Sequence, residues 1–218
     1  MRIPRRHGPA MAVAGILVLS GGIGVTPVAA QPLAVPSQAQ LQAALLTVAN
    51  LPSGMGFQSQ PVPTGNHVGS FAPCPDAAKG PQPSKAASIG FTTGTGLNTM
   101  TLIEGLQQYS AGAALATLKQ VADIVSECNN IKFHEAGLDV RMNVEREAFP
   151  SYGNGTVALR AVSDITNAND TMVDTDIVAV RHGGIVIVIT NTAEAQIFDP
   201  SLTRLAVAAA YKKAARLS

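Results

Sequence analysis

The stretch of sequence that decides the fold is residues 172–190, which read MVDTDIVAVRHGGIVIVIT. Two apolar runs flank Gly183-Gly184, and a glycine pair favours a two-residue hairpin turn because such turns need positive φ values. The turn also sets the strand register, so Val178 should face Ile189 across the hairpin. Val180 should face Ile187 on the same side, which is apolar at both of these pairs. We therefore expect two antiparallel strands whose apolar side packs on helices.

The segments around this hairpin alternate between strand-like and helix-like patterns. Ser37 with Gln40, Ser110 and Asp199 are favourable N-caps, and apolar residues recur at helical spacing behind each. The predicted elements are helices over Leu41–Val48, Ser110–Val125 and Pro200–Leu217, strands over Ala87–Thr93, Asn98–Gln108, Met142–Phe149, Thr156–Ile165, Met172–Arg181 and Ile185–Thr190, and a loop over Gln58–Lys85. This order predicts a single α+β domain with a mostly antiparallel sheet packed with helices.

The N-terminus has the three parts of an export signal. Three arginines stand within the first six residues, an almost wholly apolar run covers residues 9–19, and Val28-Ala29-Ala30 fits the small-x-small cleavage rule. The apolar run is shorter than the roughly 20 residues of a membrane-spanning helix. We expect residues 1–30 to be a signal peptide that is cleaved before Gln31. The alternative is an uncleaved anchor.

Cleavage would leave a flexible leader over residues 31–40 and one domain over residues 41–218. No later stretch is apolar for the roughly 20 residues that a bilayer requires, so we expect no transmembrane segment after cleavage. The expected location is extracytoplasmic, either secreted or in the cell envelope.

The charge of the chain argues against one class of partner. The chain has 15 lysines and arginines and 14 aspartates and glutamates, and loss of three signal-peptide arginines leaves 12 against 14, a net charge of −2. The basic residues form no cluster, whereas nucleic-acid binding needs a basic face. We expect no nucleic-acid partner, and instead an unknown small molecule or envelope component.

The chain has two cysteines, Cys74 and Cys128. An exported chain meets an oxidising compartment in which thiols pair, and two cysteines allow one intramolecular pairing. The bond would close a loop of about 54 residues, which a chain-entropy treatment values at about 4 kcal/mol. Cys128 continues the apolar stripe of the helix behind Ser110, so its thiol should point inward. We expect a disulfide rather than a metal site or a nucleophile, because neither cysteine has metal-ligating neighbours.

No motif predicts catalysis or metal binding. Asp164, Asp170, Asp174 and Asp176 lie close together, but they lack the acid ladder, the glycine and the closing glutamate of a calcium loop. We interpret them as a solvated strand end. The histidines are not spaced as a metal pair, and no complete nucleophile elbow is present. We expect no metal, no cofactor and no enzymatic activity.

Two arginines are the candidate ligand-binding residues. Arg181 should lie opposite Val186, at the charged end of the second hairpin side, and Arg160 interrupts an otherwise apolar strand. The second side predicts either a sheet face covered by loops or a groove with Arg160 and Arg181 at its rim. Such a groove suits an acidic or amphiphilic ligand, because arginine holds an anion by paired hydrogen bonds. The Gly183-Gly184 turn fixes the sheet face on which Arg181 lies, whereas no turn fixes the face of Arg160.

Several segments carry a resemblance to a known family. They are LLTVANLPSG at residues 45–54, the loop Cys74, the helix from Ser110 to Cys128, and Val180-Arg181-His182-Gly183 ahead of a long C-terminal helix. From about Leu41 to Leu217 the chain resembles the PknH-like extracellular domain family of actinobacterial exported proteins, named for the sensor portion of a mycobacterial serine/threonine kinase. The resemblance implies an antiparallel sheet and helices around a cleft for an unidentified ligand, without catalytic residues. The chain departs from the kinase sensor in having no kinase domain and one possible disulfide instead of two.

These features predict a secreted, extracytoplasmic ligand-binding or sensor-like domain that catalyses no reaction. Two alternatives are open. One is a secreted hydrolase whose catalytic residues are dispersed along the chain. The other is a cell-envelope interaction protein that uses an apolar sheet face. The sequence indicates neither the ligand nor the oligomeric state.

Overall fold

The computed structural model describes residues 35–63, 80–95, 98–135, 137–166 and 171–217. These described residues belong to one compact unit. The predicted signal peptide lies outside the described residues, so it stays a prediction.

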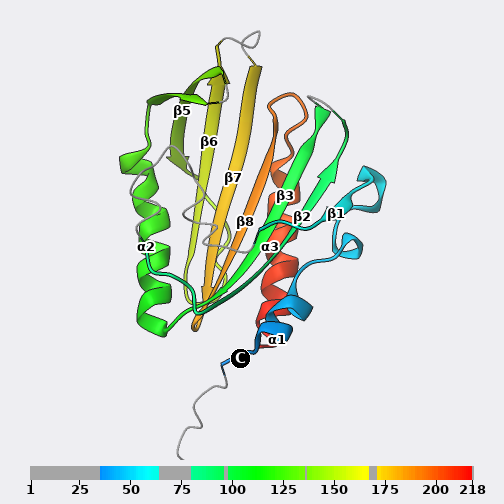
Figure 1. Cartoon of the computed structure of the whole chain (residues 1–218), viewed down its shortest axis with the longest axis vertical. Helices are drawn as coiled ribbons and strands as arrows, with labels where there is room; N and C mark the ends of the chain where they lie inside the picture. Colours follow the sequence, from blue (N-terminus) through cyan, green and yellow to red (C-terminus); the bar gives the residue numbers. More distant parts are fainter. Residues whose placement is uncertain (1–34, 64–79, 96–97, 136, 167–170, 218) are drawn as a thin grey trace, which may run out of the picture. The chain divides into compact units, whose positions relative to one another are not determined.

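Within these described ranges, eight antiparallel strands form one sheet in the order β1-β2-β3-β8-β7-β6-β5-β4 (Figure 1). The strands are β1 Gln58–Gln60, β2 Lys85–Thr93, β3 Met100–Gln108, β4 Ile131–Glu135, β5 Leu138–Arg146, β6 Thr156–Ile165, β7 Thr171–His182 and β8 Ile185–Glu194. Val178 pairs with Ile189 across the Gly183-Gly184 turn, in which Gly183 has a φ of 58°. The predicted hairpin and the predicted α+β class are therefore confirmed.

In the part of the chain that the structure describes, three α-helices and two short 3-10 helices accompany the sheet. They are α1 Gln38–Ala44, α2 Ala111–Glu127, α3 Pro200–Ala214, η1 Val48–Asn50 and η2 Ser53–Met55. The predicted N-caps each accept a hydrogen bond from a backbone N–H group, Ser37 from Gln40, Ser110 from Ala113 and Asp199 from Ser201. Among the described residues, no helix is both long and apolar enough to cross a membrane.

Helices cover both faces of the sheet. α1 and α3 pack on one face, here called the α3 face, over the hairpin side that carries Val178 and Ile189. α2 packs on the opposite face, the α2 face, along β5 to β8, where its Leu118 shares a second core with Ala179 and Val188. The predicted packing of helices on the first side is confirmed. The second side, expected to be loop-covered or an open groove, is covered along these strands by α2.

The strands at the two edges of the sheet are absent from the sequence prediction. β1 lies inside the segment expected as a loop, and β4 follows directly after α2. Both are short, and an edge strand pairs on one side only, so it needs little apolar patterning to form. β5 begins at Leu138 instead of Met142, and Phe149 leaves the sheet to pack on the α3-face core.

Cys128 lies at the C-cap of α2 and is fully buried in the α2-face core. The inward position that the helical stripe predicts for this thiol is confirmed. Cys74 lies outside the described residues, so the disulfide stays a prediction.

Candidate functional site

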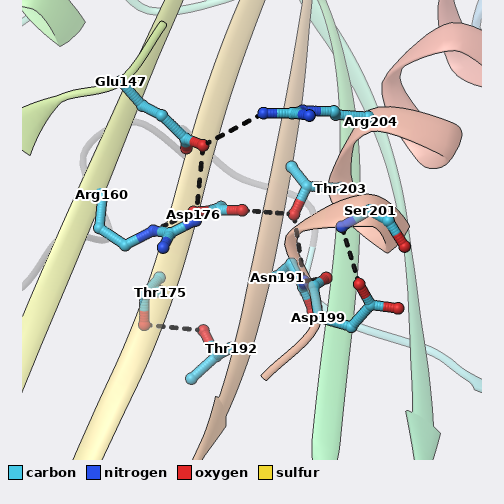
Figure 2. A network of polar contacts seen from close by, with 10 residues as sticks. All are labelled: Glu147, Arg160, Thr175, Asp176, Asn191, Thr192, Asp199, Ser201, Thr203 and Arg204. Carbon is cyan, nitrogen blue, oxygen red and sulfur yellow. Dashed lines mark hydrogen bonds and ion pairs between the residues drawn. The ribbon is translucent and has the colours of Figure 1, made fainter. Parts of the chain in front are cut away.

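A network of polar side chains lies on the α3 face, beside the first turn of α3 (Figure 2). Arg160, a predicted ligand-binding residue, stands in the middle of β6 and pairs across the strands with Asp176 of β7. Its Nε donates a hydrogen bond of 2.7 Å to Asp176 Oδ1, and the Asp176 side chain is 1% exposed. The second oxygen, Oδ2, accepts a bond of 2.6 Å from the hydroxyl group of Thr203. One buried carboxylate thus joins β6, β7 and α3.

The network continues from Thr203 to β8. The side-chain amide of Asn191 donates to Thr203 Oγ1 and to the backbone oxygen of Asp199, both over 3.1 Å. Asp199 is the N-cap of α3. Asn191, Thr203 and Asp176 are fully buried, so their bonds form where water does not compete. These bonds therefore position the start of α3 on the sheet.

The network reaches solvent at Glu147, just after β5. Its Oε1 lies 3.5 Å from Nη2 of Arg160 and 3.9 Å from Nη2 of Arg204. Burial raises the pKa of Glu147, the negative charge of Asp176 raises it further, and Arg160 opposes both effects. The guanidinium group of Arg160 also stands 4.8 Å from the centre of the Phe198 ring, a cation–π distance.

The surroundings of Arg160 limit what it can do. Its guanidinium group contacts two carboxylates and one aromatic ring, and its side chain is 24% exposed. Holding a ligand anion by paired hydrogen bonds would require Arg160 to release Asp176, a carboxylate that water does not reach. The arrangement therefore fits a network that fixes the position of α3.

Arg181 lies on the other face of the sheet. It pairs with Val186 as predicted, but it stands an odd number of positions from Asp176 on β7, so the two side chains point to opposite faces. Arg160 shares the face of Asp176, and the idea that both arginines border one groove is therefore wrong. Arg181 Nη2 donates over 3.0 Å to the backbone oxygen of Asn154. Its Nε is buried and has no hydrogen-bond partner among the described residues.

The interpretation of the aspartates as a solvated strand end is wrong for Asp176, which is fully buried. The sequence contained a signal for this burial. Asp176 lies two and four positions before Val178 and Val180, so its side chain points to the same face as these two core residues. Thr203 and Glu147 were not among the residues predicted from the sequence. No local pattern could reveal them, since they meet Asp176 only in the folded chain.

A hollow of about 500 Å³ lies along the β4–β5 hairpin. Its charged lining residues include Lys132 and Arg141, which pair across the two strands, and His134 Nδ1, which lies 2.8 Å from Asp139 Oδ1. These side chains are exposed at the sheet edge. Among the described residues, no group of histidines, cysteines and acids is arranged to hold a metal ion.

A smaller cavity of about 240 Å³ lies at the end of the sheet, beside the β7–β8 turn; we call it the end cavity. Tyr109, Ile185 and Leu217 supply apolar lining, and His182 adds a polar group next to Arg181 in the chain. The ring of His182 stands edge-on to Tyr211, with 5.6 Å between the ring centres. The cavity thus combines apolar walls with few polar groups.

No protein-family model matches this chain, and no curated protein matches it in sequence. Among solved structures, the chain is similar to the extracellular domain of PknH from Mycobacterium tuberculosis, with a TM-score of 0.59 and 12% sequence identity. The match covers 85% of this chain and 98% of that one. The chain has the fold of the PknH extracellular domain. The predicted resemblance is therefore confirmed for the fold, whereas membership of a sequence family stays a prediction.

Proposed function

We propose that this chain is an extracytoplasmic ligand-binding or sensor-type domain that catalyses no reaction. The observation that carries the proposal is the fold, because the similarity extends over nearly the whole extracellular domain of PknH. The export-signal pattern in residues 1–30 supports the same location.

The end cavity is the proposed ligand site. Small-molecule sites are concave and mostly apolar, with a few polar groups that orient the ligand, and this cavity has such a lining. His182 is the polar group proposed to orient the ligand there. Arg181, the predicted contact for an acidic group, does not line this cavity, because it points to the sheet face opposite to that of its neighbour His182. Arg160 is not proposed for this site, since it bonds to Asp176 and does not line the cavity. The expected ligand is a small apolar molecule with one acidic or polar group, either free or part of an envelope component.

Native mass spectrometry of protein purified from its own cell envelope tests this proposal. Ala111 lines the end cavity, whereas Ala116 is exposed on the same helix. A small molecule should co-purify with the wild-type chain and with Ala116→Phe, and Ala111→Phe should lose it because the new ring fills the cavity. Loss from neither variant, or release of the molecule in a chemically altered form, would contradict the proposal.

A further inference from the structure

A buried carboxyl group lies between the sheet and the segment that follows α1. Glu104 stands in the middle of β3 and is 0% exposed. Its Oε2 accepts a hydrogen bond of 2.5 Å from the backbone N–H of Leu46. Its Oε1 is buried and has no hydrogen-bond partner among the described residues. A charge at this position is costly, because water is excluded and one oxygen lacks a donor.

Lys213 of α3 is the charged group that faces Glu104. Its positive charge favours the ionised carboxylate, and its Nζ donates a hydrogen bond to the backbone oxygen of Leu45. Among the described residues, the other elements around Glu104 bring no charge. Its cross-strand neighbours are Ile89 on β2 and Ile189 on β8, and α1 has no titratable side chain. One carboxyl group and one cation therefore hold the junction between α1 and η1.

Removal of this junction would leave the sheet intact. β3 pairs with β2 and β8 along its whole length, and these ladders do not involve α1. α1 is attached mainly through its buried residues Leu41 and Ala44 and through a bond of 2.6 Å from Gln38 to the backbone oxygen of Ala86. An opening limited to α1 and the junction would therefore bring water to Glu104 without unfolding β3.

We infer that Glu104 makes the junction between α1 and η1 a proton-controlled latch. In the protonated form, Glu104 still accepts the hydrogen bond of Leu46 and carries no buried charge, so the junction stays closed. In the ionised form, the carboxylate gains hydration when the junction lifts, so opening is favoured. The opened state exposes the apolar side chains of Leu41 and Leu46, which are buried in the closed state. This inference does not depend on the proposed ligand.

The direction of the pH effect follows from the proton affinities of the two states. Burial raises the pKa of Glu104 from 4.5 to about 7, against the lowering effects of the Leu46 bond and Lys213. The closed state therefore binds the proton more tightly than an opened state with a hydrated carboxyl group. The stabilisation that the bound proton gives to the closed state is complete below pH 4.5 and is lost as the pH rises through about 7. Linkage gives an increase in the opening equilibrium of about 25-fold between pH 5.5 and pH 8.

Native-state hydrogen exchange of the Leu46 amide measures this opening, after correction for the intrinsic exchange rate. The opening equilibrium should rise by roughly 25-fold between pH 5.5 and pH 8 in the wild-type chain. Glu104→Gln should remove this dependence, because the amide keeps an acceptor oxygen for Leu46 but does not ionise. The Cys128 amide, which bonds to Ile124 at the C-terminal end of α2, is the internal control, and its opening equilibrium should stay well below that of Leu46 at both pH values, because it does not open with the junction.

Carbon-13 NMR of the Glu104 carboxyl group gives a second measurement that does not need the Gln variant to fold. Its midpoint should lie near pH 7 and should move upward in Lys213→Met, because the favourable cation is removed. A midpoint near 4.5 would overturn the latch. So would pH-dependent exchange of Leu46 that persists in Glu104→Gln, or equal opening equilibria at Leu46 and Cys128, which would show that both amides open by global unfolding.

Discussion

Replacement of Asp176 by alanine should destabilise the domain strongly. Asp176 accepts bonds from Arg160 Nε over 2.7 Å and from the Thr203 hydroxyl group over 2.6 Å. Without it, the Arg160 guanidinium group loses its closest anion and Thr203 loses its acceptor. Both groups remain in a region that water reaches poorly, since Thr203 is fully buried and Arg160 is 24% exposed.

The magnitude follows from these two losses. Removal of one partner from a buried ion pair costs about 3–5 kcal/mol, and a buried hydroxyl group that has no acceptor for its proton costs about 1–3 kcal/mol. The partial exposure of Arg160 and the remaining carboxylate of Glu147 reduce the first figure. We expect a total loss of about 3–4 kcal/mol in the free energy of unfolding. This corresponds to a decrease in Tm of roughly 10 °C for a domain of this size.

Urea denaturation followed by circular dichroism measures this loss. Asp174→Ala is the matched control, because Asp174 lies on the same strand and the same face, and it should change the stability by less than about 1 kcal/mol. The double variant Arg160→Met/Asp176→Leu should recover much of the loss, since it leaves no unpaired buried charge. A cost below about 1 kcal/mol for Asp176→Ala would refute the view that this network positions α3.

Three further predictions concern processing, the crosslink and the hairpin turn. N-terminal sequencing of the exported protein should start at Gln31, give or take a couple of residues, and a retained initiator methionine would contradict cleavage. Thiol labelling of the unreduced, denatured protein should find no free thiol if Cys74 and Cys128 are bonded, whereas two labelled cysteines would disprove the disulfide. Gly184→Ala should destabilise by about 1–3 kcal/mol in thermal unfolding, because a Cβ there would lie 2.6 Å from a backbone oxygen. Gly112→Ala, where the structure leaves open space for a Cβ, should be neutral or stabilise by about 0.5 kcal/mol, and equal losses at both glycines would contradict the steric reason.

The sequence by itself determined the elements whose signals are local. A two-residue glycine turn sets its own register, so the pairing of Val178 with Ile189 could be predicted without any knowledge of the rest of the chain. The N-caps at Ser37, Ser110 and Asp199 were equally local, because a cap bonds within its own helical turn. The inward position of the thiol at the end of α2 followed from helical periodicity for the same reason.

Only the tertiary structure decided which residues those elements bring together. Arg160 and Arg181 were both candidate ligand-binding residues, yet strand parity places Arg160 against Asp176 and Arg181 on the opposite face. Glu104 gave no local sign of its role, since its partners Leu46 and Lys213 come from distant segments that meet over β3. Hydrogen bonds and charge interactions act over a few ångströms in space. The number of residues between two groups does not determine that distance, because the packing of the helices on the sheet decides which groups meet.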